Sequence, residues 1–151
     1  MPGNLCFTAI NPVWDSTILI DFTGLKAGRI AGTITKKTMY LSPETATKIQ
    51  GLYAITDPCL IPAEKLIASV TQAILGGARV IQYRNKSASK TIQYQEAGQL
   101  SSLCKQHEVC FIINDDAQLA KAVDADGVHV GKEDGKIADA RKCLGKQAII
   151  G

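Results

Sequence analysis

Polar side chains that suit a phosphate group occur at the end of an apolar run near residue 83. Gln82, Arg84 and Lys86 alternate with Tyr83 and Asn85, and the alternation of an extended strand places the first three on one face. Two cations and an amide on one face favour phosphate or pyrophosphate, because Arg and Lys donate charge-assisted hydrogen bonds to phosphate oxygens. The alternative is a solvated basic loop, since charged residues are mostly exposed and common just past a strand end.

A second group of polar side chains, all carboxylates, follows two later apolar runs. Asp115 comes soon after the third run, and Glu133 and Asp134 come soon after the fourth. Adjacent strands of a sheet lie about 4.8 Å apart, so Asp115 and one of the other two carboxylates can share a metal ion. Mg²⁺ suits this arrangement, because it takes few carboxylates and fills its remaining octahedral positions with water and phosphate oxygens.

These residues also have a purely structural explanation. Asn114 or Asp115 can cap the helix after the third run, and Asp134 can cap the helix after the fourth, since short polar side chains satisfy the free N–H groups of a first helical turn. Taken one at a time, capping is the better explanation. When the carboxylates are considered together with Arg84 and Lys86 on the neighbouring strand, the magnesium interpretation becomes the stronger of the two.

The elements that position these residues are predicted by an alternation of short apolar runs with segments of helical period. Each run is nearly all apolar, as expected for parallel strands buried on both faces, and the polar groups follow their carboxyl ends, where parallel α/β proteins place their chemistry. The predicted strands cover residues 52–56, 79–83, 109–113, 127–130 and 148–150. Before residue 51 there are scattered turn formers and a short candidate strand at 17–22, with no sustained period.

Composition excludes several classes of protein. The chain has 151 residues, 46% hydrophobic and 21% charged, and its formal charge of +3 is too small to predict a nucleic-acid partner. No apolar run has the roughly 18–20 residues of a membrane span. Five cysteines without a CxxC pair predict neither a disulfide framework nor a zinc ribbon. We therefore expect a soluble protein of the cytoplasm.

Several blocks of the chain resemble one known family. In chain order they are LYAITD (52–57), GGARVIQYRNK (76–86), IINDDAQLA (112–120), ADGVHVGKED (125–134), AR-x-x-LG (140–145) and IIG (149–151), and together they resemble thiamine phosphate synthase. The resemblance implies an α/β fold, a (βα)₈ TIM barrel, with residues 51–151 forming its N-terminal half of about four βα units and a fifth strand. Residues 1–50 are then an N-terminal extension of unassigned structure, and Met39 is a candidate for the true start.

The resemblance also implies an activity. Members of the family are transferases that join two small molecules, hydroxymethylpyrimidine diphosphate and thiazole phosphate. The pyrimidine diphosphate loses pyrophosphate, and the product is thiamine phosphate. Arg84 and Lys86 are the candidate catalytic residues, since they would neutralise the charge on the departing pyrophosphate. The residues matching the family's substrate-binding positions are Gln82, Tyr83, Arg84, Asn85, Lys86 and Asn114, and those matching its magnesium-binding aspartates are Asp115 and Asp134.

The chain departs from the family pattern in two ways. Lys132 stands where the family commonly has glutamine, and the sequence ends at Gly151, on the predicted fifth strand. The family's later blocks, which hold the thiazole phosphate, have no counterpart here. We therefore expect this polypeptide to be inactive, or nearly so, by itself. A half barrel also leaves its first and fifth strands unpaired, which predicts self-association through the open edges.

Two other functions compete with the synthase interpretation. A thiazole phosphate tautomerase is similar in overall sequence but would not need diphosphate and magnesium groups, so the intact set of these residues argues against it. The other competing interpretation is a non-catalytic fragment that keeps the motifs without their function.

Overall fold

The structure, a computed structural model, describes residues 6–10, 18–20, 48–131 and 137–151. Lys132, Glu133 and Asp134, for which the sequence suggests roles, lie outside the described residues, as does Met39.

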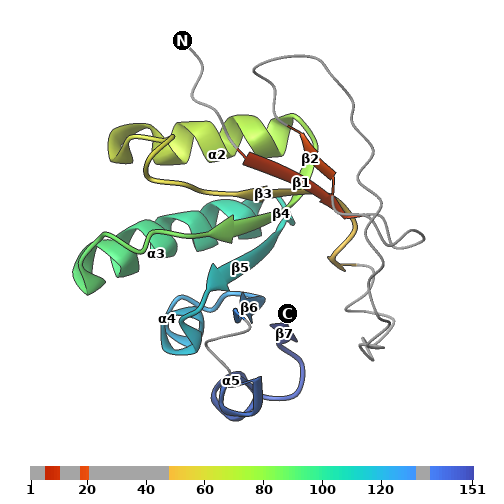
Figure 1. The fold of residues 1–151 in the computed structure, drawn as a ribbon, viewed down its shortest axis with the longest axis vertical. Coiled ribbons are helices and arrows are strands. Elements are labelled where there is room, and N and C mark those ends of the chain that lie inside the picture. The colour runs from red at the N-terminus through yellow and green to blue at the C-terminus, as the bar shows by residue number, and fades with distance from the viewer. Residues whose placement is uncertain (1–5, 11–17, 21–47, 132–136) are drawn as a thin grey trace.

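Five parallel strands form the main part of a single sheet (Figure 1). They are β3 (Gly51–Ile55), β4 (Ala78–Tyr83), β5 (Cys110–Asn114), β6 (Gly127–His129) and β7 (Ile149–Ile150), and they neighbour one another in chain order. The predicted parallel α/β architecture is thus confirmed, and each predicted strand overlaps an observed one. The agreement has a simple cause, because a strand covered on both faces must be apolar along its whole length.

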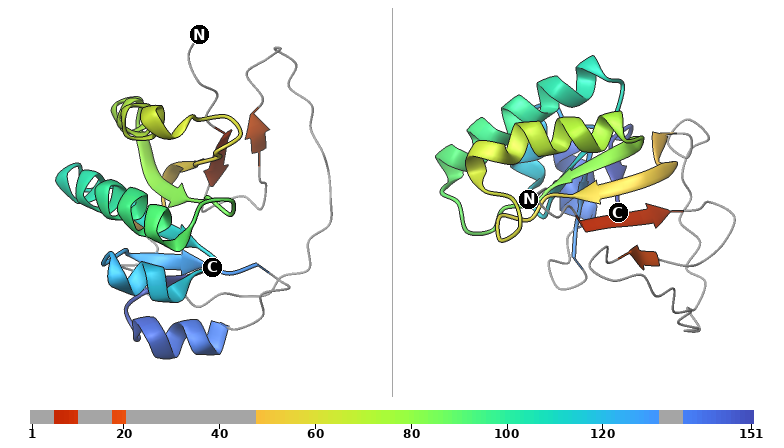
Figure 2. Two further views of the ribbon diagram at one scale, coloured as in Figure 1. Left: turned by 90° about the vertical axis from the view of Figure 1, so that its left-hand side faces the viewer. Right: turned by 90° about the horizontal axis from the view of Figure 1, so that it is seen from above.

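The helices that connect these strands lie on one side of the sheet, as Figure 2 shows. They are the short 3₁₀ helix η1 (Ala63–Lys65) and the helices α2 (Leu66–Leu75), α3 (Lys90–Gln106), α4 (Ala117–Ala122) and α5 (Ile137–Leu144). Alternate strand residues pack against them, among them Ile81, Phe111, Ile113 and Val128, all almost fully buried. This arrangement matches the wall of a βα barrel, in which helices cover the outer face.

The opposite, inner face of the sheet holds a second apolar cluster, formed by Tyr53, Val80, Cys110, Ile112 and Ile149. Side chains two residues apart on a strand share a face. Gln82 follows Val80, and Asn114 follows Ile112, so both polar residues belong to this inner face near the carboxyl ends of their strands. The alternation of side chains along each strand therefore places Gln82 and Asn114 on the face opposite the one that the helices cover.

Two further strands precede the parallel set. β1 (Cys6–Ile10) pairs antiparallel with β3 along its whole length, from Cys6 opposite Ile55 to Ile10 opposite Gly51. β2 (Ile18–Ile20), within the candidate strand at 17–22, pairs with the other edge of β1. The expectation that the first barrel strand is unpaired is therefore wrong. That expectation considered only the strands of the barrel. β1, which precedes them in the chain, satisfies the free N–H and C=O groups of the β3 edge.

Within the described ranges, the helices are all too short or too polar to cross a lipid bilayer.

Candidate functional site

The carboxyl ends of β3, β4 and β5 meet at one rim of the sheet. The rim comprises these ends and the residues that follow them, 56–57, 84–88 and 115–116. Parallel pairing aligns Ile55 with Gln82 and Tyr83 with Ile113, so the three loops leave the sheet side by side. Side chains from segments about 30 residues apart in sequence are thereby brought within hydrogen-bonding distance.

A continuous chain of hydrogen bonds crosses the inner face of the rim. The Tyr53 hydroxyl donates to Gln82 Oε1 at 2.7 Å, and Gln82 Nε2 donates to Asn114 Oδ1 at 2.7 Å. Asn114 Nδ2 then donates to Asp115 Oδ2 at 2.6 Å. Gln82 is only 4% exposed, and a buried amide needs such partners. The chain fixes the orientation of both amides, so the rim is ordered without a ligand.

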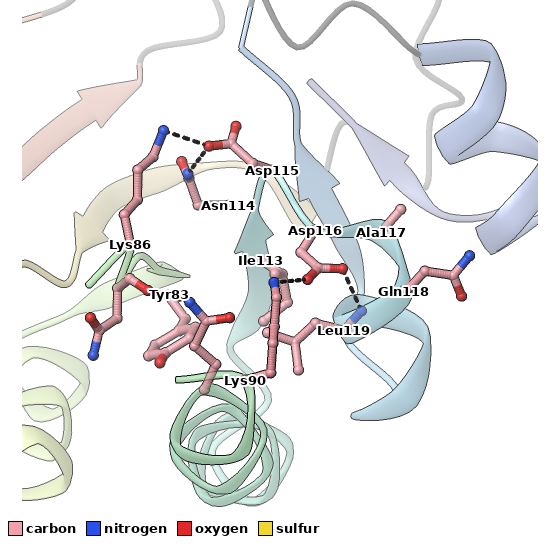
Figure 3. A pocket seen from close by; sticks show the side chains of 12 residues that line it. Tyr83, Lys86, Lys90, Ile113, Asn114, Asp115, Asp116, Ala117, Gln118 and Leu119 are labelled. Atoms are coloured by element: carbon pink, nitrogen blue, oxygen red, sulfur yellow. Dashed lines mark hydrogen bonds and ion pairs between the residues drawn. The ribbon is translucent and has the colours of Figure 1, made fainter. Parts of the chain in front are cut away.

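Lys86 and Asp115 form the charged centre of the rim, as Figure 3 shows. Lys86 Nζ lies 2.7 Å from Asp115 Oδ2, and the Gly131 amide donates to Asp115 Oδ1 at 3.4 Å. Partial burial raises the pKa of the Asp115 carboxyl, but hydrogen bonds from Lys86, Gly131 and Asn114 lower it more, leaving it below the ordinary value. Asp115 is thus held as an anion, the form in which a carboxylate binds a metal ion.

The capping explanation for Asn114 and Asp115 is wrong, because Asp116 is the N-cap of α4. Its Oδ1 accepts a hydrogen bond from the Leu119 amide at 2.8 Å, and its Oδ2 pairs with Lys90 at 2.8 Å. Asp115 adopts a left-handed backbone conformation, with φ of 64°. This turn sends the two neighbouring carboxylates in different directions, so that one caps the helix and the other faces the rim.

Arg84 contacts residues at the end of β3 and not Asp115. Its Nη1 lies 3.9 Å from Asp57 Oδ2, and its amide donates to the Thr56 hydroxyl at 2.9 Å. Neither Thr56 nor Asp57 is among the site residues predicted from the sequence. The signal was nevertheless present, because Thr56 ends the first predicted strand and Asp57 follows it, much as Asp115 follows the third.

Tyr83 and Asn85 make contacts on the helix side of the sheet. The Tyr83 hydroxyl donates to Glu96 Oε2 of α3 at 2.6 Å, and Asn85 Nδ2 donates to the same oxygen at 3.0 Å. The resemblance counts both residues among those that bind substrate, and in this structure their polar groups are already bonded to α3. Glu96 had no sequence signal, since it lies within a helix 11 residues beyond Asn85.

A cavity of about 490 Å³ opens beside Lys86 and Asp115, between residues 84–88 and the start of α4 (Figure 3). Its volume is within the range of ordinary ligand pockets. Its lining combines the cations of Lys86 and Lys90 with the carboxylates of Asp115 and Asp116. Because charges of both signs line it, the cavity suits a ligand that carries phosphate together with a cation.

Comparison with known proteins identifies the family. The model of the family described as "Thiamine monophosphate synthase" matches residues 52–151.

The chain belongs to the thiamine monophosphate synthase family.

Relatives agree with this membership. The thiamine-phosphate synthase of Alcanivorax borkumensis is 51% identical over 104 residues, covering 69% of this chain and 48% of the relative. That of Nitrosococcus oceani is 49% identical over 106 residues, covering 70% and 49%. A solved thiamine phosphate pyrophosphorylase from Pyrococcus furiosus superimposes with a TM-score of 0.57 at 37% identity, covering 66% of this chain and 47% of that one. The chain therefore spans about half the length of the relatives it matches.

The residues of this thiamine monophosphate synthase family member fit a magnesium ion that is shared with a phosphate. Among the described residues, no three His, Cys, Asp or Glu side chains gather into a metal cage. Magnesium is ordinarily held by one or two carboxylates together with substrate phosphates. Asp115 supplies one such carboxylate, already ionised and open to the cavity. Asp134, the second predicted ligand, is outside the described part of the chain.

Proposed function

We propose that this chain binds the diphosphate of hydroxymethylpyrimidine diphosphate together with Mg²⁺, for transfer of the pyrimidine to thiazole phosphate. The product would be thiamine phosphate, with pyrophosphate released. The observation that supports the proposal most directly is the Lys86–Asp115 contact of 2.7 Å at the mouth of a cavity, on a rim that also carries Arg84. The two substrates are those that the resemblance to thiamine phosphate synthase implies, and the family match over residues 52–151 supports them.

The proposed chemistry breaks one bond and forms another at the same carbon. The bond between the pyrimidine methylene carbon and the diphosphate oxygen breaks, and the thiazole nitrogen then bonds to that carbon. Lys86 and Arg84 would neutralise the negative charge that develops on the departing oxygen. Bound magnesium would supply further positive charge at the diphosphate, held by Asp115 and Asp134.

Gln82 and Asn114 would orient the pyrimidine. Both belong to the inner face of the sheet, and each already uses part of its amide in the chain that runs from Tyr53 to Asp115. A side chain held in one orientation loses little entropy when it binds, so it can align a substrate effectively. Tyr83 and Asn85 bond to Glu96, and we assign them to support of the loop.

Lys86 is 61% exposed and its ion pair is near the surface, and such pairs contribute only about 0–1 kcal/mol. Lys86 can therefore leave Asp115 at little cost when a ligand arrives. In the proposed complex, Asp115 would help to hold the metal ion and Lys86 would bind a phosphate oxygen. This exchange keeps both charges paired.

Isothermal titration calorimetry with pyrophosphate tests the proposal. We expect binding by the purified chain in the presence of Mg²⁺ and little or none when EDTA removes it. Lys86→Gln should weaken binding roughly tenfold, since charge-assisted hydrogen bonds contribute about 1.5–3 kcal/mol. Lys146→Gln is the matched control, because exposed Lys146 precedes β7, at the end of the sheet opposite the rim. Equal affinity with and without magnesium would contradict the proposal.

We infer that the complete reaction requires groups beyond those of this chain. The relatives that share its sequence are about twice as long as the matched region, and a whole barrel takes roughly 200–250 residues. The 151-residue polypeptide is therefore expected to bind magnesium pyrophosphate without forming product. A direct assay for thiamine phosphate from the two substrates decides the matter, and turnover at an ordinary rate would refute the inference. Absence of both binding and turnover would favour the tautomerase-like or non-catalytic alternatives.

We also infer a reducing, cytoplasmic setting, which is supported by the free thiols of Cys59, Cys104, Cys110 and Cys143. For self-association we propose the outer edge of β7. Within the described strands, β7 pairs on one side only, with β6. No nucleic-acid or membrane partner is proposed.

A further inference from the structure

The rim loop, residues 84–88, carries Arg84 and Lys86, yet one set of its hydrogen bonds leads away from the rim to α3. Asn85 Nδ2 donates to Glu96 Oε2 at 3.0 Å. The hydroxyl of Tyr83, at the end of β4, donates to the same oxygen at 2.6 Å. One carboxylate oxygen of α3 thus holds both the end of the strand and the start of the loop.

Asn85 passes this restraint to the rest of the rim loop. Its Oδ1 accepts hydrogen bonds from the Ser87 hydroxyl and the Ala88 amide, both at 3.1 Å. Its backbone carbonyl accepts a hydrogen bond from Gln93 Nε2 of α3 at 2.7 Å. Lys86 lies between the bonded residues on either side. Fixing the Asn85 side chain therefore fixes the backbone that carries Lys86.

The other side of the loop is held by β3. The Thr56 hydroxyl accepts a hydrogen bond from the Arg84 amide at 2.9 Å and donates to the Arg84 carbonyl at 3.3 Å. Thr56 is buried, so water competes little for these bonds. The backbone of Arg84 is thus clamped by Thr56, and that of Asn85 is clamped from α3, while the side chains of Arg84 and Lys86 stay half-exposed or exposed.

Tyr83 remains a hydrogen-bond donor over the whole physiological range. Burial raises the pKa of its hydroxyl, and the Glu96 carboxylate raises it further, far above the ordinary value. The protonated phenol and the side-chain amide N–H each donate a hydrogen bond, and an ionised carboxylate can only accept them. The donors and the acceptor are therefore matched in kind as well as in distance.

We propose that Glu96 is a positioning residue, which holds the backbone of the rim loop so that the segment carrying Arg84 and Lys86 is already ordered before a magnesium diphosphate binds. The identity of the ligand rests on the proposed function. The ordering of the loop does not, because it is a property of the unliganded chain. Groups that are already ordered avoid the entropy cost of immobilisation on binding, which strengthens affinity without any new contact.

Two measurements on the full chain test this role, with three variants. Glu96→Ala removes the shared acceptor, whereas Glu96→Gln keeps a carbonyl oxygen with two lone pairs that can accept from both donors. Glu64→Ala, in η1, removes an exposed carboxylate and is the charge-matched control. Hydrogen exchange of the Ala88 amide reports loop order without ligand. Calorimetric titration with magnesium pyrophosphate reports binding, and thermal unfolding reports overall stability.

In Glu96→Ala we expect exchange at Ala88 to be roughly tenfold faster, with exchange at Val80 and Ile81 of β4 unchanged. Affinity for magnesium pyrophosphate should fall about fivefold to tenfold, as expected for the loss of one or two hydrogen bonds. Glu96→Gln should restore most of both properties. Removing a negative charge would by itself strengthen anion binding, so a weakening in Glu96→Ala and none in Glu64→Ala identifies positioning rather than electrostatics.

Unchanged Ala88 exchange in Glu96→Ala would overturn the positioning role, whatever the ligand. A loss of affinity that Glu96→Gln does not restore, or one that follows the drop in thermal stability in all variants, would overturn it as well. Failure of the unaltered chain to bind magnesium pyrophosphate overturns the proposed function instead. The exchange comparison then still decides whether Glu96 orders the loop.

Discussion

At the scale of single residues, the backbone of Asp115 decides what its side chain can do. Its φ of 64° lies in the left-handed region, which asparagine and aspartate tolerate better than most residues. The Asp115 amide bonds to the His129 carbonyl at 2.7 Å, so the neighbouring strand supports this conformation. Residues held in such conformations cluster at functional sites, in agreement with the proposed metal-binding role.

Asp115→Asn removes the charge and keeps the backbone preference. We expect magnesium-dependent pyrophosphate binding to weaken roughly 10-fold to 100-fold or more, because even residues that only support a metal ligand have effects of this size. Thermal stability should change little. Asp139→Asn in α5, which lies in an exposed pair with Lys142, is the control, and calorimetry of both variants is the measurement. Equal weakening in the two variants would contradict a ligand role for Asp115.

The cysteines differ sharply in expected reactivity. Burial raises the pKa of Cys104 and Cys110 to about 12, so at pH 8 only on the order of one in ten thousand is a thiolate. Cys59 is exposed. Alkylation with iodoacetamide, followed by peptide mass spectrometry, should modify Cys59 in the native chain and reach Cys104 and Cys110 only after unfolding. Labelling of all three at similar rates would show that the core around α3 and β5 opens readily.

At the scale of elements, β6 and β7 approach each other so closely that only glycine fits between them. A Cβ at Gly127 would lie 2.0 Å from the carbonyl oxygen of Ile149, and that backbone oxygen cannot rotate away. β6 also carries His129, whose carbonyl supports Asp115. The spacing of these two strands therefore affects the rim as well as the core.

Gly127→Ala should lower the free energy of unfolding by about 2–3 kcal/mol, since overpacking forces the backbone to shift. Gly98→Ala is the matched control, because a Cβ at this position in α3 meets nothing within 4 Å. There, alanine should stabilise the helix by about 0.5–1 kcal/mol. Chemical denaturation of both variants measures the difference. A small or stabilising effect at Gly127 would mean that β7 is held only loosely.

At the scale of the whole molecule, β1 covers the edge of β3 that would otherwise be unpaired. β3 has β4 on one side and β1 on the other, so β1 occupies the edge at which a parallel strand would have to pair to close a barrel. An edge can hold only one strand. Pairing of β1 with β3 and closure of a barrel onto β3 therefore exclude each other.

Thr8→Pro tests the protection of this edge. Thr8 is the central residue of β1 and lies opposite Leu19 of β2 and Tyr53 of β3. Proline has no backbone N–H to donate to the neighbouring strand, so it is not tolerated in a strand that is paired on both sides. We expect faster hydrogen exchange in β3 and concentration-dependent self-association, measured by light scattering after size-exclusion chromatography. Thr8→Val keeps the amide and should behave like the unaltered chain. If Thr8→Pro left β3 exchange unchanged, β1 would not be what protects the edge.

The sequence by itself determined the parallel strands and which of their ends carry polar groups. Both follow from local pattern, because a doubly covered strand is apolar throughout and the polar residues come directly after it. It also allowed Lys86 and Asp115 to be expected at one rim, since parallel strands align their carboxyl ends. The same reasoning applied to the first predicted strand, 52–56, would have added Asp57, which follows it directly.

Only the tertiary structure decided which polar groups pair. Asp115 faces Lys86 because a left-handed turn separates it from Asp116, which takes the cap. Glu96 reaches Asn85 because α3 folds back along β4, and β1 reaches β3 across more than 40 residues of chain. These contacts join segments that are distant in sequence, and each depends on the packing of whole elements. Hydrophobic period and spacing describe one segment at a time, so they do not contain this information.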